Sequence, residues 1–149
     1  MCLNVIVNYY STDGTNWTAG NTMPVGSAYI VYGNGMFVTG TAYSTDGINW
    51  TAGGAMPSTA NWSSVTYGNG RFVSAAPNSN KAAYSTDGIN WISSTMPSSS
   101  NWQGLVYANG KFVAVVQNGS ASAYSTDGIT WNTGAMPSSA MWYSTAASH

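Results

Sequence analysis

The sequence predicts an all-β protein that is built from several copies of one four-stranded antiparallel sheet. Three observations lead to this prediction: an octapeptide recurs four times, a heptapeptide alternates with it, and Asn-Gly or Asp-Gly pairs stand inside both. No stretch shows the apolar period of a helix, while Gly and β-branched residues occur throughout. Because self-similarity at a fixed spacing outweighs local propensity, the repeats define the architecture.

The repeat unit is about 40 residues long, within one domain that spans residues 1–149. The octapeptide reads YSTDGINW at 43–50 and at 84–91, with near copies at 10–17 and 124–131. The heptapeptide Y-x-N-G-x-F-V lies at 32–38, 67–73 and 107–113. A Met-Pro pair follows each octapeptide, and in three units a Trp stands five residues after the Pro. The resulting units are 1–24, 25–57, 58–97, 98–137 and 138–149.

Each complete unit is expected to contribute four strands, because both motifs contain residue pairs that favour tight hairpin turns. Asn, Asp and Gly tolerate the positive φ that such turns require. In the last complete unit the expected strands are Trp102–Tyr107, Lys111–Gln117, Ala121–Thr126 and Ile129–Thr133. About 40 residues, four antiparallel strands and a repeated Trp are typical of one blade of a β-propeller.

The two ends of the chain are predicted to share one blade. Its strands two to four are expected at Leu3–Val7, Tyr9–Thr12 and Thr15–Trp17, and its first strand at Met141–Ser148. Such a split blade closes the ring and removes exposed sheet edges. Two rings remain open: four blades in one chain closed by the C-terminal strand, or a larger homo-oligomeric ring in which chains exchange this strand.

The composition limits the possible partners. Only 5% of the residues are charged, the formal net charge is -1, and the three basic residues are scattered, so nucleic acid and anionic membranes are not expected partners. One Cys2 and one His149 cannot form a recognisable zinc site or an internal disulfide. The opening MCLNVIVNYY lacks the features of a signal peptide or a membrane span. We therefore expect no metal, no cofactor and no membrane insertion.

The octapeptide resembles the Asp-box of the bacterial neuraminidase repeat family, which combines Ser or Thr, Asp, Gly and an aromatic residue. Gly follows Asp directly here, one residue earlier than in the usual box, which predicts a tighter turn. The resemblance implies a structural role for the box between strands three and four. It also implies an extracellular or virion-surface setting, since similar repeats occur in bacterial and phage surface proteins. The matching residues are Ser11, Asp13, Gly14, Trp17, Ser44, Asp46, Gly47, Trp50, Ser85, Asp87, Gly88, Trp91, Ser125, Asp127, Gly128 and Trp131.

The resemblance to sialidases does not extend to their chemistry. Those enzymes hold the substrate carboxylate with three arginines and use a Tyr–Glu pair, whereas this chain has one arginine, Arg71, and no Glu. Glycoside hydrolysis in general needs two carboxylates that face one bond, and here one Asp stands in each equivalent turn. The sequence therefore predicts a protein without enzymatic activity.

Two kinds of function remain. The first is a non-catalytic, lectin-like binding module in which Trp62, Trp102 and Trp142 stack on glycans and Asn61 and Asn101 hydrogen-bond to them. A competing interpretation places these Trp side chains in the packing between blades. The second is a structural or protein-interaction propeller of a phage or bacterial surface assembly, or an engineered or recently duplicated repeat protein without a small ligand. Glycans and further copies of the chain are the partners that these functions imply.

Overall fold

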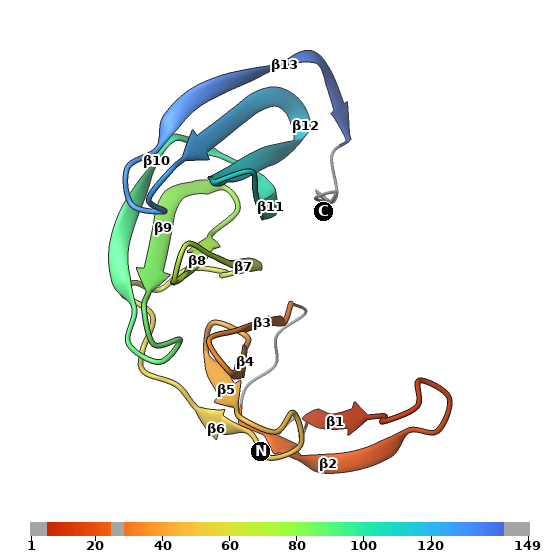
Figure 1. The fold of residues 1–149 in the computed structure, drawn as a ribbon. Coiled ribbons are helices and arrows are strands. Elements are labelled where there is room, and N and C mark those ends of the chain that lie inside the picture. The colour runs from red at the N-terminus through yellow and green to blue at the C-terminus, as the bar shows by residue number, and fades with distance from the viewer. Residues whose placement is uncertain (1–5, 25–28, 142–149) are drawn as a thin grey trace, which may run out of the picture.

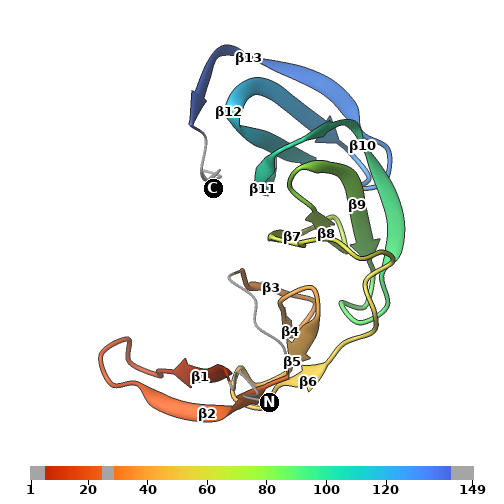
Figure 2. The same ribbon diagram turned by 180° about the vertical axis from the view of Figure 1, so that it is seen from behind.

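Residues 6–24 and 29–141 are described by a computed structural model, in which they form four antiparallel sheets. The sheets follow one another along an open arc, which Figure 1 shows from the front and Figure 2 from behind. No helix occurs among the described residues, and accordingly none of them forms a helix long and apolar enough to cross a membrane. The prediction of an all-β chain of repeated sheets is confirmed.

The strands of the first sheet are β1 (Ile6–Tyr10) and β2 (Thr18–Met23). The second sheet consists of β3 (Val31–Gly33), β4 (Met36–Val38), β5 (Ala42–Ser44) and β6 (Thr51–Ala52). The third consists of β7 (Ser64–Gly68), β8 (Arg71–Ala75), β9 (Ser79–Ser85) and β10 (Ile92–Ser100). The fourth consists of β11 (Trp102–Ala108), β12 (Lys111–Ser125) and β13 (Asn132–Met141).

Each complete sheet is a meander in which strands that follow one another in sequence are also paired in space. The first strands, β3, β7 and β11, lie on the inner side of the arc, and the last strands, β6, β10 and β13, lie on its outer side (Figures 1 and 2). This radial order from inside to outside is that of a propeller blade. The sheets do not end at the predicted unit boundaries, because β10 runs on to Ser100 and β13 to Met141.

The Asn-Gly pairs form the predicted two-residue hairpins. Asn34 and Gly35 join β3 to β4 with φ values of 50° and 76°, and the pairs that begin at Asn69 and Asn109 have the same signs. Positive φ at both central residues is the property of the type I′ turn, whose twist matches that of the flanking strands. Local sequence is sufficient to determine these turns.

The Asp-Gly pairs do not form two-residue turns, which corrects the prediction. The fourth strand begins only after the Trp of the octapeptide: β2 begins at Thr18 and β13 at Asn132. The expected strands Thr15–Trp17 and Ile129–Thr133 therefore begin too early. The physical reason is that the Ser and Asp side chains bind backbone N–H groups inside the segment, which keeps those groups from pairing with another strand.

The first sheet contains two described strands and not three. β1 covers Ile6–Tyr10 with an irregular register between Val7 and Tyr9, so one strand overlaps the end of Leu3–Val7 and the start of Tyr9–Thr12, which were predicted to be two strands. In the second sheet the chain turns between β4 and β5 at Gly40, which has a φ of 91°. Val7 occupies the position equivalent to Gly40, since each stands three residues before the Tyr of its octapeptide. A β-branched residue does not favour a positive φ, so the chain does not turn at Val7 as it does at Gly40. The predicted closing strand beyond Met141 lies outside the described residues.

The fourth sheet shows that one assigned strand can contain two predicted ones. β12 covers both Lys111–Gln117 and Ala121–Thr126 except for the last residue. Its ribbon doubles back on itself (Figure 1), and Asn118 within it has a positive φ of 58°. The arms of β12 pair with β11 on one side and β13 on the other.

Two apolar clusters hold successive sheets together. Val38, Phe72, Ala83 and Trp91 are buried between the second and third sheets. A larger cluster between the third and fourth sheets includes Val73, Trp102, Phe112 and Trp131. Burial of these side chains, at roughly 1.5–3 kcal/mol for each large one, is the main force that stacks one sheet on the next.

Candidate functional site

The S-T-D-G turns are built by their own Ser and Asp side chains. In the second copy, Ser44 Oγ donates to Asp46 Oδ1 over 2.9 Å and accepts the N–H groups of Asp46 and Gly47 at 3.3 and 2.9 Å. Asp46 Oδ1 also accepts the N–H groups of Ile48 and Asn49 at 2.8 and 2.7 Å. The same five bonds recur in the other three copies. Each carboxylate is thus engaged by its own turn.

These hydrogen bonds lower the pKa of all four carboxyls below their ordinary value of 3.8. The N–H of Asn16 is the largest cause for Asp13, and the side-chain amide of Asn90 is the largest cause for Asp87. A carboxyl with a lowered pKa is a poor proton donor near neutral pH. Among the described residues, no three His, Cys, Asp or Glu side chains gather as a metal site requires.

The Trp residues predicted to bind glycans are placed in the packing where the structure describes them. Trp102 is 1% exposed and its indole N–H donates to the Ser98 carbonyl at 3.1 Å, so its ring is covered and has no face to stack on a ligand. Trp62 is half-buried and its indole N–H donates to Ser58 O at 3.1 Å, while it packs against the cluster of Val38. For Trp102 the structure contradicts the lectin-like role, and Trp142 lies outside the described residues.

The two Asn residues predicted beside them differ. Asn61 is exposed. Asn101 is half-buried, donates to Gln117 Oε1 at 3.0 Å and accepts from Gln103 Nε2 at 3.0 Å. Asn101 therefore holds strands of the fourth sheet together and has little capacity left for a ligand.

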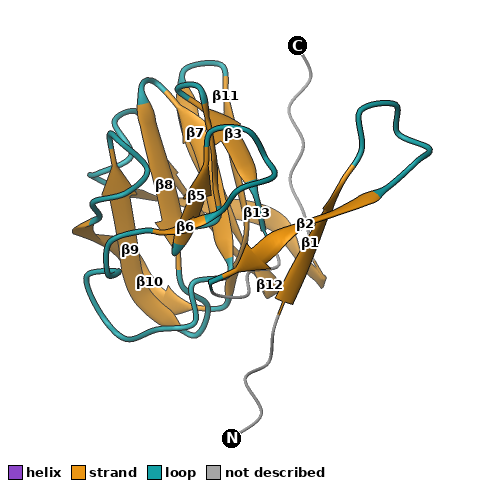
Figure 3. Ribbon diagram, turned by 90° about the horizontal axis from the view of Figure 1, so that it is seen from below, coloured by secondary structure: helices purple, strands orange, loops and turns teal. Residues whose placement is uncertain are grey.

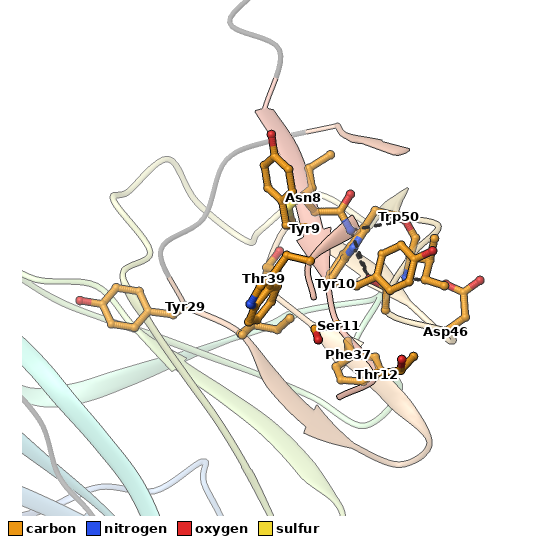
Figure 4. A pocket seen from close by; sticks show the side chains of 15 residues that line it. Asn8, Tyr9, Tyr10, Ser11, Thr12, Tyr29, Phe37, Thr39, Asp46 and Trp50 are labelled. Carbon is orange, nitrogen blue, oxygen red and sulfur yellow. Dashed lines mark hydrogen bonds between the residues drawn. The ribbon is translucent and has the colours of Figure 1, made fainter. Parts of the chain in front are cut away.

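A concave site lies elsewhere, between the β1–β2 hairpin and the second sheet. This cavity, called the hairpin cavity below, has a volume of about 470 Å³. Aromatic rings dominate its walls: Tyr9, Tyr10 and Trp17 from the hairpin region, and Tyr29, Phe37 and Trp50 from the second unit. Figure 4 shows Tyr9 and Tyr10 on β1 and Phe37, Thr39 and Trp50 on the neighbouring segments, with Tyr29 at one side.

The rings of the hairpin are exposed because nothing described covers them. Trp17 is 64% exposed, whereas its equivalents Trp50, Trp91 and Trp131 are buried. A Cβ at Gly14 would meet no atom within 4 Å, whereas at Gly128 it would lie 3.2 Å from the Phe112 ring of its own sheet. Over residues 6–24 and 29–141, no inner strands accompany the first hairpin as they do in the complete sheets.

Asparagine side chains fix the hairpin to the second sheet. Asn8 Nδ2 donates to the carbonyls of Gly47 and Ile48 at 3.2 and 3.4 Å (Figure 4). The N–H of Asn21 donates to Ile48 O at 3.3 Å, and Asn21 Oδ1 accepts the N–H of Trp50 at 3.0 Å. Asn8 Oδ1 is buried and has no hydrogen-bond partner among the described residues. This oxygen lies against Gly20 of β2, where a Cβ would come within 2.6 Å of it, so Asn8 serves to fix the hairpin and not to contact a ligand.

Sequence reasoning missed the hairpin cavity, although the sequence contains a signal for it. The first octapeptide is the only copy that no Y-x-N-G-x-F-V heptapeptide precedes. Among the described residues no inner strands accompany the first octapeptide, whereas β3 and β4, which contain a heptapeptide, precede the second.

Together these features define the class of the protein: a propeller-type repeat chain whose first blade is incomplete over the described residues. No protein-family model matches the chain, and no similarity to a curated protein is found. A solved structure titled "YCF48 bound to D1 peptide" is similar in fold, with a TM-score of 0.53 and 16% sequence identity. The similarity covers 80% of this chain and 43% of that one, so the chain spans less than half the length of this neighbour. It supports the β-propeller fold.

Proposed function

We propose that the chain is a non-catalytic binding module that holds an extended polypeptide segment in the hairpin cavity. The observation that carries this proposal is the exposure of Trp17 and Tyr9, at 64% and 63%, beside an aromatic cavity of about 470 Å³. Aromatic rings of this kind are the usual anchors of protein and peptide interfaces, because they bury a large area at a low cost in conformational entropy.

The backbone of β1 supports a peptide as the ligand. Among the described residues β1 pairs only with β2, so its other edge presents N–H and C=O groups in an extended row. An extended peptide can add to such an edge as a further strand. The neighbour's title records a bound peptide, which supports this class of ligand for a propeller but does not identify it.

The same proposal assigns the S-T-D-G turns to the Asp-box class in a purely structural role. Five hydrogen bonds within each turn support it, since they satisfy the backbone of the loop without any ligand. The carboxylates are then part of the scaffold, and binding depends on the aromatic residues. This division agrees with a protein that has no catalytic step.

The test is selection of peptides from a displayed random library on the immobilised full chain, followed by titration with tryptophan fluorescence as the readout. We expect Trp17→Ser and Tyr9→Ser to weaken the selected peptides at least about tenfold each, or about 1.4 kcal/mol. Ile92→Ser is the matched control, because Ile92 is 55% exposed on β10 and does not line the cavity. Peptides that bind both cavity variants as tightly as the control would overturn the proposal.

A glycan in the same cavity is the second candidate. The exposed indole of Trp17 lies in a wall that also contains Asp46, and sugars are bound by stacking on an aromatic face together with hydrogen bonds to carboxylates. A glycan array read with the wild-type chain and with Trp17→Ser separates the two ligands. Trp17-dependent glycan binding without any selected peptide would favour this candidate.

A further inference from the structure

We infer that the two ends of the arc are complementary halves of one interface, through which a second copy of this chain joins head to tail. The inference concerns the outer faces of the first and last sheets, so it goes beyond the hairpin cavity. The contact between the second and third sheets, and that between the third and fourth, has two sides: a turn glycine on one sheet and a valine on the preceding sheet. Each end of the arc carries one of these two sides.

The apolar part of the contact is a turn glycine packed on a valine of the preceding sheet. A Cβ at Gly88 would lie 2.6 Å from Cγ2 of Val38, and a Cβ at Gly128 would lie 2.6 Å from Cγ2 of Val73. Both valines are fully buried as a result. Only glycine allows this approach, because any side chain would displace the valine or separate the sheets.

The polar part of the contact also repeats. The N–H of Gly54 donates to Ile89 O at 2.9 Å, and Ser94 Oγ donates to Ile129 O at 2.6 Å. Between the third and fourth sheets, Arg71 Nη1 also donates to Asp127 O at 2.9 Å. Each sheet thus offers donors and a valine to the S-T-D-G turn of the next sheet.

At the N-terminal end of the arc the turn has no preceding sheet against it. Gly14 occupies the position of Gly88 and Gly128, but a Cβ there would meet nothing within 4 Å. The turn that contains it extends away from the other sheets (Figure 3). Its backbone has the same internal hydrogen bonds as the packed turns, so it is already in the conformation that the contact requires.

At the C-terminal end no further described sheet follows the valine side of the contact. Val113 corresponds to Val38 and Val73 but is only partly buried. Tyr124 is 40% exposed, whereas its equivalents Tyr43 and Tyr84 pack against the two core clusters. The fourth sheet therefore exposes the same residue types that the second and third sheets bury against their next sheet.

Lys111 matches the polar part of the contact. Lys111 corresponds to Arg71 and is exposed on the fourth sheet. Because Arg71 Nη1 donates to the backbone carbonyl of Asp127, the same correspondence directs Lys111 to the backbone carbonyl of Asp13. Asp13 is the acidic residue of that turn, so the two ends also carry opposite charges, which favours their pairing.

The arrangement of the sheets selects a second copy as the partner. The two ends of the arc lie on either side of its open side, so among the described residues neither end covers the other (Figures 1 and 2). A head-to-tail contact between unlike surfaces produces a closed ring when the rotation between copies closes. Two arcs joined at both ends would form such a ring.

The experiment is the native mass of the full chain over a range of concentrations, measured by light scattering or sedimentation equilibrium. We expect a species of twice the 15.6 kDa of one chain. Gly14→Asn should reduce it to the single-chain mass, because Asn tolerates the φ of 75° while its side chain blocks the valine. Val113→Asp should do the same from the other end. Gly35→Asn is the matched control, since Gly35 also has a positive φ and open space but lies at a hairpin on neither end.

Mixing the two variants tests the direction of the contact. Gly14→Asn and Val113→Asp each keep one intact half, so an equal mixture should recover a two-chain species that neither forms alone. A single-chain mass for the wild type at all concentrations would overturn the inference, whether the chain then closes its own ring or leaves its ends free. Peptide binding in the hairpin cavity is measured separately and uses none of these three positions.

Discussion

The Ser–Asp pair of the octapeptide makes the same hydrogen bonds in every copy, yet its surroundings differ. Ser85 and Ser125 are completely buried, and Ser11 is partly exposed. Water can replace a lost hydrogen bond only where it has access. The same substitution should therefore have different effects in different copies.

Ser85→Ala should lower the free energy of unfolding by about 1–3 kcal/mol, because it leaves the buried N–H of Gly88 without an acceptor. Ser11→Ala should cost less than about 0.5 kcal/mol, since water reaches the equivalent N–H of Gly14. Urea unfolding followed by circular dichroism measures both. Equal effects of the two substitutions would show that burial does not determine the contribution of these turns.

The four Asp carboxyls make the protein sensitive to acid. They are the only acidic side chains in the chain, and their folded-state pKa values are lowered from 3.8. The folded state therefore binds fewer protons than the unfolded chain in acid, so the stabilisation is complete above about pH 5 and is lost progressively as the pH falls below 3.8 toward the lower folded-state pKa values. Thermal unfolding between pH 7 and pH 2 should show a falling Tm below about pH 5. A Tm that stays constant down to pH 2 would contradict this expectation.

At the scale of elements, the two hairpin motifs were not equally predictable. Asn34-Gly35 specifies its turn through backbone φ alone, so the ends of β3 and β4 follow from the sequence. The segment from Ser44 to Trp50 specifies its loop through side-chain bonds to five backbone or hydroxyl groups, which no propensity includes. The predicted fourth strands therefore begin earlier in the sequence than the observed ones, β2 and β13.

Trp102→Ala tests whether the repeated Trp belongs to the packing of the elements. Trp102 is 1% exposed within the largest core cluster, so its removal should lower the free energy of unfolding by about 3–5 kcal/mol. A ligand-stacking Trp would leave stability nearly unchanged. Phe112→Leu, which alters the same cluster by a smaller volume, is the control, and denaturant unfolding is the measurement.

At the scale of the whole molecule, close approach between first strands determines how the sheets are arranged. A Cβ at Gly33 would overlap the ring of Tyr67, and a Cβ at Gly68 would overlap the ring of Tyr107. Each glycine thus receives the aromatic residue of the next first strand on the inner side of the arc. The glycine–tyrosine contact and the contact between a turn glycine and a valine both occur between the second and third sheets and again between the third and fourth. Successive sheets are therefore packed in the same way, as in other repeat proteins.

The sequence by itself determined the repeat, the strand content and the turn chemistry, because these depend on interactions between residues that lie close together in the chain. Only the tertiary structure decided which copies of one motif are covered and which are open. Trp17 and Trp131 end nearly identical octapeptides, but among the described residues only Trp131 has inner strands of its own sheet around it. Burial depends on the neighbouring sheet, so four nearly identical octapeptides include three packed turns and one exposed aromatic site.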